Sequence, residues 1–415
     1  MNTNFRFLSL ILLVLFSTQT SFATEPTIAE LRAMGPAGLE VLMNRYAAEI
    51  KQHIASPSTA PDDEWQRITS DLDTVAQQKN SYISGLYWYT DLESAKKASA
   101  ASGKPILSLR LLGKLTDEFS CANSRFFRTV LYPNAEVSAA LRDRFVLHWQ
   151  SVRPVPKVTI DYGDGRKLER TLTGNSIHYV LDSEGRPVEA LPGLYGPQAF
   201  LRELEKAETF FKSIAVRPAE QRRAITKSYW EQQHNKISAA WTTDVQKIGG
   251  EAPRGFRISK GADGDALTIS TLAVTKAYSE ANVLLAMTTA TDTLGRITDE
   301  AAWKKIAQLH SSDAMLDDRS ISLIKHQNPT LTDQELSQLL QKFQELIALD
   351  TVRNEYLMHS QLYVWLVRDP VRDDVEKLNE QVYAKLFLTP KADPWLGLLL
   401  PDAYTALDNG GVIKN

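Results

Sequence analysis

The spacing of apolar residues divides the chain into three regions. Residues 27–54 and 64–80 carry apolar side chains every three or four positions, which is the spacing of amphipathic helices. From residue 85, such stretches alternate with short apolar runs typical of β-strands. After residue 217 the strand pattern largely stops, and helical spacing recurs in residues 218–248, 266–289, 299–309, 332–367 and 373–387. We therefore expect a helical arm, an α/β region and an all-α region, in that order.

The middle region is predicted to form a sheet covered by helices. Gly163, Asp164 and Gly165 separate two β-branched stretches, which indicates a hairpin within residues 157–173. The other expected elements are a helix, a strand, two helices, a strand, a strand-turn-strand unit and a closing helix, at 90–103, 105–113, 120–131, 132–144, 145–152, 176–191 and 196–214. Because helices alternate with strands, the expected fold class is an α/β domain with a central mixed sheet flanked by helices, plus a C-terminal all-α domain.

Three helix starts carry the sequence of a capping box, in which a Ser or Thr is followed three residues later by Glu or Gln. The pairs are Thr27 with Glu30, Thr90 with Glu93, and Thr332 with Glu335. In each pair we expect the threonine hydroxyl to accept a hydrogen bond from the backbone N–H of the glutamate. The arm, the α/β region and the all-α region thus each contain one predicted capping box.

The first residues have the pattern of a secretory signal peptide. Arg6 is followed by an apolar run in residues 7–16 and by a polar stretch that ends at Ala23. The run is shorter than the ~20 residues that span a bilayer, and small residues occupy the two positions that signal peptidase reads. We expect cleavage near Ala23 and a periplasmic or secreted mature chain with no membrane span. An uncleaved N-terminal anchor is the alternative.

The expected organisation is therefore a signal peptide in residues 1–23, an N-terminal helical arm in 24–84, the α/β domain in 85–215 and the all-α domain in 216–415.

The net charge of the chain indicates which kinds of partner it is not expected to bind. The 415 residues carry a formal net charge of -3, with Lys and Arg scattered among Asp and Glu. Because nucleic acids and anionic membranes are normally bound by a basic patch, neither is an expected partner.

Metal and cofactor sites are not predicted either. The seven histidines show no metal-ligand spacing. The sequence also lacks a P-loop, a dinucleotide fingerprint and a nucleophile-elbow motif. We therefore expect no metal and no cofactor.

The single cysteine, Cys121, lies in the stretch "EFSCANSRFF". Exported chains often pair their cysteines, and this one cannot form an internal disulfide. Cys121 is therefore either a small buried residue without chemistry or a thiol whose reactivity is controlled by its site.

Four blocks of sequence resemble the thioredoxin-like superfamily. They are "YWYTDLESAKKASAASGKPILSL", "CANS", "YPNAEVSAALRDRFV" and "YVLDSEGRPVEALPGLYGPQAFLREL". The resemblance covers roughly residues 85–212, and no family is recognised for the helical remainder. It implies a thioredoxin-like fold in which Cys121 takes the place of the nucleophilic cysteine, Ser124 that of the resolving cysteine, and Ser176 that of the cis-proline.

These differences from the family pattern limit the implied chemistry. With Ser124 in place of a second cysteine, the site cannot cycle between a dithiol and an internal disulfide. What remains is a monothiol oxidoreductase or isomerase activity, in which Cys121 forms a mixed disulfide with an exported protein or a small thiol. A helix N-terminus at Cys121, with Arg125 one turn further, would favour its thiolate.

The alternative function is a non-catalytic binding or scaffold protein of the cell envelope, with Cys121 buried and inert. Burial of the sulfur is the feature that separates the two hypotheses, because a reactive thiol has to be accessible. His178 lies two residues from Ser176 and is the histidine expected to come closest to Cys121. His148 and His178 are otherwise expected on strands that flank the strand beginning at Pro105.

Overall fold

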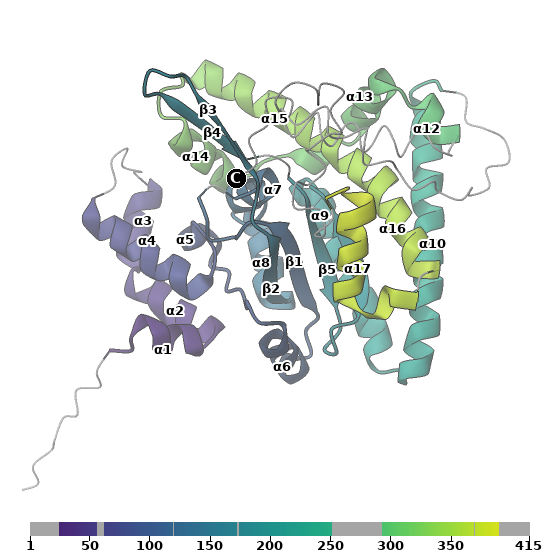
Figure 1. The fold of residues 1–415 in the computed structure, drawn as a ribbon, viewed down its shortest axis with the longest axis horizontal. Coiled ribbons are helices and arrows are strands. Elements are labelled where there is room, and N and C mark those ends of the chain that lie inside the picture. The colour runs from purple at the N-terminus through teal and green to yellow at the C-terminus, as the bar shows by residue number, and fades with distance from the viewer. Residues whose placement is uncertain are drawn as a thin grey trace, which may run out of the picture.

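The computed structural model describes residues 25–55, 62–118, 120–171, 174–250, 293–368 and 370–389 (Figure 1). The predicted signal peptide, residues 1–23, and the predicted helix at 266–289 lie outside the described residues. The described parts form an N-terminal helical arm, a central sheet with helices around it and a helical C-terminal region (Figure 1).

The N-terminal arm is a cluster of short helices with its own hydrophobic core. Its helices are α1 (Ile28–Ala33), α2 (Pro36–Arg45), α3 (Ala47–Ala55), α4 (Asp63–Ala76) and α5 (Ser81–Ser84). Leu31, Leu42 and Leu72 are fully buried in this core. The Arg32 side chain donates hydrogen bonds to the carbonyl oxygens of Val75 and Trp88 over 2.9 and 2.7 Å. These bonds tie α1 to the chain that leads into the sheet.

The central sheet has four strands in the order β2-β1-β5-β6. β1 pairs with β2 in parallel and with β5 antiparallel, and β5 pairs antiparallel with β6. The strands are β1 (Ile106–Leu112), β2 (Val146–Arg153), β5 (Ser176–Leu181) and β6 (Pro187–Pro192). A separate antiparallel hairpin of β3 (Lys157–Asp161) and β4 (Lys167–Thr171) turns at the predicted Gly-Asp-Gly sequence.

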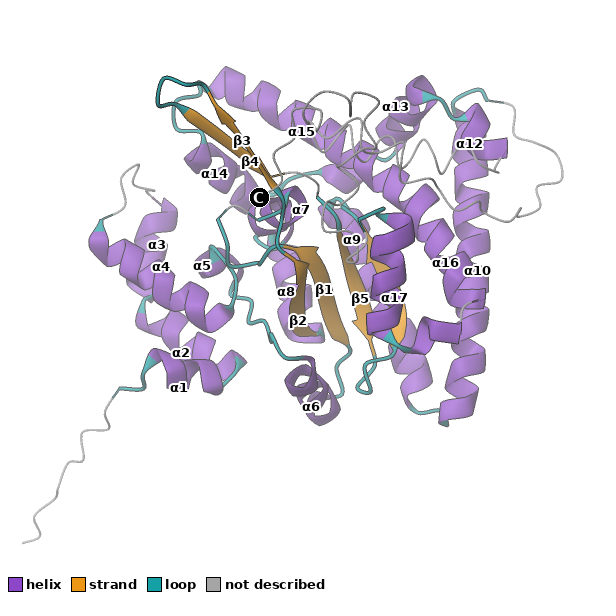
Figure 2. Cartoon of the chain, in the orientation of Figure 1, coloured by secondary structure: helices purple, strands orange, loops and turns teal. Residues whose placement is uncertain are grey.

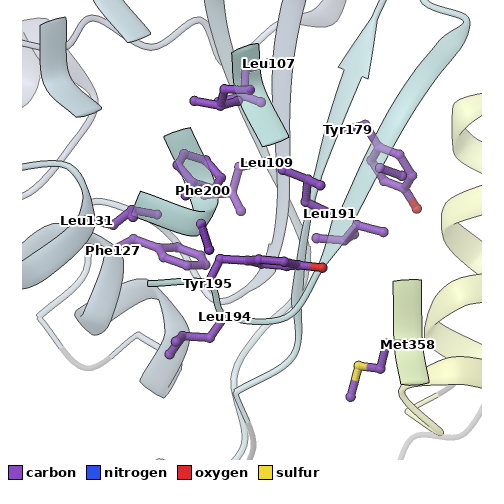
Figure 3. Close-up of a cluster of buried hydrophobic side chains, with 14 of the residues drawn as sticks. Leu107, Leu109, Phe127, Leu131, Tyr179, Leu191, Leu194, Tyr195, Phe200 and Met358 are labelled. Carbon is purple, nitrogen blue, oxygen red and sulfur yellow. The ribbon is translucent and has the colours of Figure 1, made fainter. Parts of the chain in front are cut away.

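Helices flank the strands of the sheet (Figure 2). They are α6 (Leu92–Ser102), α7 (Ala122–Phe126) with the π-helical turn η1 (Phe127–Leu131), α8 (Ala135–Arg144) and α9 (Pro197–Ala215). All seven residues of β1 are buried. One face of the sheet supplies Leu107 and Leu109 to a core that also contains Phe127 and Phe200 (Figure 3). A strand buried on both faces explains why the 105–113 stretch is almost continuously apolar.

The C-terminal region is helical throughout its described residues. Its elements are α10 (Ala219–Lys247), α12 (Thr293–Ile297), α13 (Glu300–Leu309), η4 (Ser311–Ala314), α14 (Asp318–Gln327), α15 (Asp333–Arg353), η5 (Asn354–His359), α16 (Ser360–Arg368), η6 (Pro370–Asp373), α17 (Val375–Gln381) and η7 (Val382–Leu386). The mixed sheet with flanking helices, followed by a helical region, agrees with the predicted combination of α/β and all-α structure. One continuous hydrophobic cluster contains residues of both the central sheet with its flanking helices and the C-terminal helical region.

Buried polar contacts also join the sheet to the helical region. The carboxylate of Glu189, on β6, accepts hydrogen bonds from the hydroxyls of Tyr229 and Tyr363 over 2.7 and 2.8 Å, and from Nε2 of His359 over 3.1 Å. Burial favours the neutral acid, but the hydrogen bonds outweigh it and hold the pKa of Glu189 below its usual value. On β1, Arg110 pairs with Glu376 of α17 over 2.6 Å.

Two of the three predicted capping boxes are present. Both hydrogen bonds of the box form at Thr27 with Glu30 and at Thr332 with Glu335. The prediction for Thr90 was wrong, because the helix begins one residue later and Asp91 is its N-cap. The Asp91 carboxylate accepts a hydrogen bond from the Ser94 backbone over 2.8 Å. Asp is a strong N-cap residue, and here it takes the role predicted for the preceding threonine.

None of the described helices is both long enough and apolar enough to cross a membrane.

Candidate functional site around Cys121

Cys121 lies at the N-terminus of α7, directly after the connection from β1. It is the N-cap of this helix, and its Sγ accepts a hydrogen bond from the backbone N–H of Ser124 over 3.4 Å. α7 continues without a break into η1, so residues 122–131 form one helical run. The predicted helix at 120–131 is therefore present, with Cys121 at its start.

The thiol of Cys121 is enclosed. The residue is 0% exposed, as are Ser120 and Ser124. Burial disfavours a charged thiolate, whereas the N–H of Ser124 and the helix N-terminus favour it. A disulfide from another molecule therefore has no access to the sulfur unless the surrounding residues move.

Ser124, which stands where the resemblance puts a resolving cysteine, belongs to a closed hydrogen-bond network. Its hydroxyl accepts a hydrogen bond from Ser120 Oγ over 2.9 Å. Ser120 in turn accepts one from the Arg128 guanidinium over 3.0 Å. Arg128 also donates to the backbone oxygens of Ser124 and Glu118, each over 3.3 Å. These contacts fix the side chains around the helix start.

Arg128 is the cationic residue that sequence reasoning missed. The prediction named Arg125, which is exposed and reaches Thr171 on the hairpin over 3.4 Å. Arg128 is 4% exposed, and desolvation lowers the pKa of its guanidinium, while Glu118, Asp73 and Cys121 act in the opposite direction. Arg128 lies four residues after Ser124 and therefore on the same helical face, and this spacing could have indicated the contact from the sequence.

Ser176 contacts the helix that begins at Cys121. It is fully buried at the start of β5, and its Oγ accepts a hydrogen bond from Asn123 Nδ2 over 2.8 Å. The other polar side-chain atom of that amide, Asn123 Oδ1, is buried and has no hydrogen-bond partner among the described residues. The structure thus places Cys121 and Ser124 in one turn of helix, and Ser176 contacts that turn through Asn123.

The two strand histidines occupy opposite flanks of β1. His148 is on β2 and His178 on β5, as predicted. His178 forms a 2.8 Å hydrogen bond with Tyr132 and packs against the rings of Phe127 and Phe200. His148 Nδ1 lies 2.8 Å from Ser108 Oγ, and its Nε2 has no hydrogen-bond partner in the described part of the chain.

Burial keeps both histidines neutral. It lowers the pKa of His178 to about 3, and burial together with the nearby charge of Arg110 lowers the pKa of His148 to about 3. A neutral histidine is able to act as a base, but the Nε2 of His178 is already in the hydrogen bond with Tyr132. These histidines have the properties of buried sheet residues.

The described residues contain no group of three or more His, Cys, Asp or Glu side chains arranged to hold a metal ion. Comparisons of the sequence and structure with protein-family models, curated proteins and solved structures give no match.

Proposed function

We propose that this chain is an exported binding or scaffold protein of the cell envelope that uses a thioredoxin-like domain without thiol catalysis. The observation that carries this proposal is the enclosure of the Cys121 sulfur. Three features support the thioredoxin-like part. These are the sheet order β2-β1-β5-β6, the helix that starts at Cys121 directly after β1, and the contact between that helix and Ser176.

Enclosure argues against catalysis for a chemical reason. Thiol-disulfide exchange requires a thiolate to approach a disulfide sulfur in line, and the rate depends on access to both atoms. Cys121 is 0% exposed, and Ser120, Ser124 and Arg128 around it are bonded to one another. A reactive cysteine normally occupies a partly exposed electropositive position, whereas a structural one is buried and inert.

The helical region supports a scaffold role. The edge strand β6 is bonded through Glu189 to Tyr229 and Tyr363, which lie 40 and 174 residues away in sequence. The central strand is likewise bonded through Arg110 to α17. A sheet held on its edge and its face in this way forms a rigid platform, which suits binding of an envelope partner.

Monothiol exchange is the second candidate. It is favoured by the hydrogen bond from Ser124 N–H to Sγ and by the charge of the Arg128 guanidinium, which interacts with Cys121, since both stabilise negative charge on sulfur. In this reaction the Cys121 thiolate attacks one sulfur of a client disulfide, and the other sulfur leaves as a thiolate. A thiol from a second molecule then attacks the mixed disulfide and restores Cys121, because Ser124 cannot do so.

A comparison of the mature protein with its Cys121→Ala variant tests the two candidates. Reduction and isomerisation of a disulfide-bonded protein substrate are measured in a glutathione buffer. The binding proposal expects both proteins to match the rate of the buffer alone. The opposite result is turnover by the wild type that disappears in Cys121→Ala, together with a mixed disulfide trapped in the exporting cell. That result would replace the binding proposal by the exchange function.

A further inference from the structure

A cavity separate from the Cys121 site lies between the N-terminal arm and α14. Its volume is about 330 Å³, which falls within the range of about 300–1,000 Å³ found for small-molecule sites. α14 lies beside the arm (Figure 1), and the cavity is lined from α3, α5 and α14. The α14 side chains that reach it are spaced as one helical face, namely Arg319, Ser322, Leu323 and His326.

The cavity has an apolar part and a cationic part. Ile54, Ile83 and Leu323 form apolar walls, next to the ring of Tyr82. Arg319, His53 and His326 supply the polar groups, and none of the lining residues that the structure describes is an Asp or a Glu. A ligand that fits this lining has an apolar body and a negatively charged head.

Arg319 is the cationic residue of the lining, and it is solvent-exposed. Within the described part of the chain it makes no ion pair and no hydrogen bond, although most other arginines there have a carboxylate or carbonyl partner. A guanidinium presents a planar fork of N–H groups that matches a carboxylate or a phosphate. An anion in the cavity would give Arg319 the partner that the protein itself does not provide.

The two imidazoles point to the same class of ligand. The rings of His53 and His326 meet edge to face with their centroids 5.5 Å apart, and His53 stacks on Trp65 at 4.0 Å. Burial, and then the proximity of His326, lower the pKa of His53. The lowered pKa keeps His53 neutral, so Arg319 supplies the positive charge of this wall and the two imidazoles offer ring N–H groups to an anion.

The cavity is held in shape by contacts of α14. Ser320 donates a hydrogen bond to the Val130 carbonyl over 2.9 Å, and Asp317 accepts one from the Ala135 backbone over 2.8 Å. Both bonds attach α14 to the helices behind the sheet. A wall fixed in this way loses little conformational entropy when a ligand binds.

We propose that this cavity binds a small amphiphilic anion, with its carboxylate or phosphate head at Arg319 and His326 and its apolar chain against Ile54, Ile83 and Leu323. The site goes beyond the proposed scaffold function and does not depend on it, because no hydrogen bond or ion pair among the described residues joins its lining to Ser120, Ser124 or Arg128. The ligand would bridge the arm and the helical region.

The test titrates the mature full-length protein with octanoate and octyl phosphate, with octanol and octylamine as neutral and cationic probes of the same chain length. Calorimetry measures affinity, and the ring resonances of His53 and His326 report the location. We expect saturable binding of an anionic probe with shifts at these two histidines. Whichever of octanoate and octyl phosphate binds with the higher affinity identifies the head group as a carboxylate or a phosphate. Binding of octanol as tightly as either anion would overturn the proposal.

Variants on α14 provide the matched control. Arg319→Gln removes the cavity cation and should weaken binding of the anion at least about tenfold, because it removes a charged hydrogen-bond donor. Lys325→Gln removes an exposed charge on the same helix that pairs with Asp333 outside the cavity, and should leave the affinity unchanged. Ser322→Phe should block the cavity. Equal affinity in the wild type, Arg319→Gln and Ser322→Phe would contradict the assignment, whatever the Cys121 experiments show.

Discussion

Asn123 donates a hydrogen bond from its side-chain amide to the hydroxyl of Ser176 over 2.8 Å, and both residues are buried. This bond joins the second residue after the β1–α7 connection to the first residue of β5. It fixes the helix that begins at Cys121 against the sheet. Because a buried amide loses more when it is left unpaired than it gains when bonded, the pair is a structural constraint on this site.

Ser176→Ala should therefore destabilise the protein. The substitution leaves Asn123 Nδ2 buried without an acceptor, in addition to the Oδ1 atom that already lacks a partner. We expect a loss of about 1–3 kcal/mol in the free energy of unfolding, measured by urea denaturation. Ser213→Ala, on the exposed surface of α9, is the control and should stay within about 0.5 kcal/mol of wild type. Equal effects of the two substitutions would show that the bond does not constrain the site.

Glu189→Ala tests the attachment of the sheet to the helical region. The change leaves Tyr229, Tyr363 and His359 without their shared acceptor. Removal of one partner from such a buried network should cost about 3–5 kcal/mol, read from urea or thermal unfolding. Glu205→Ala removes an exposed carboxylate on α9 and serves as the control. A loss below 1 kcal/mol for Glu189→Ala, on the scale of the usual surface effect, would contradict the account.

The buried histidines predict a loss of stability in mild acid. The pKa values of His148 and His178 fall from 6.5 to about 3 on folding. Below pH 6.5 the unfolded chain therefore binds more protons than the folded one, and stability falls as pH falls. Each histidine contributes about 1.4 kcal/mol per pH unit between its two pKa values.

His178→Gln isolates one of these contributions. Glutamine keeps a side-chain amide that can hydrogen-bond the Tyr132 hydroxyl, but it does not titrate. The slope of the unfolding free energy against pH should therefore fall by the contribution of one titrating group. Unfolding is measured between pH 7 and about pH 5, above the range where most carboxylates titrate. An unchanged slope in the variant, or a His178 ring resonance that titrates near its ordinary value in the folded protein, would rule out the assignment.

The export prediction rests on residues 1–23, and N-terminal sequencing of the protein recovered from the exporting cell checks it. The mature chain should begin at Thr24. Leu12→Arg interrupts the apolar run and should leave the precursor inside the cell, because a charged residue in that run prevents its recognition as a signal peptide. Recovery of an intact Met1 on exported or membrane-bound protein would support the uncleaved anchor instead.

Local sequence patterns predicted much of the fold. Periodicity located the strands on either side of Cys121, the Gly-Asp-Gly sequence located the hairpin, and helical spacing separated the α/β region from the helical one. Each of these signals lies within a few neighbouring residues. The error at Thr90 has the same local origin, since Thr90 and Asp91 are both good N-cap residues and only the backbone decides between them.

Contacts between distant residues were not predictable in this way. Glu189 meets His359 across 170 positions, and His53 meets His326 across the arm and the helical region. Neither pair has a local motif, because tertiary packing brings it together. Burial of Cys121 is a third example. The resemblance placed the residue at a helix start, but its exposure depends on what the rest of the chain packs around it.

The rate of Cys121 alkylation against pH, in the folded mature protein and in the unfolded chain, tests the central claim most directly. A buried structural cysteine should label only as fast as the protein opens, so the folded protein should remain unmodified while the denatured chain reacts with a midpoint near the ordinary thiol value of about 8.5. Rapid labelling of the folded protein, with a midpoint well below that value, would show an accessible thiolate and would replace the scaffold function with thiol exchange.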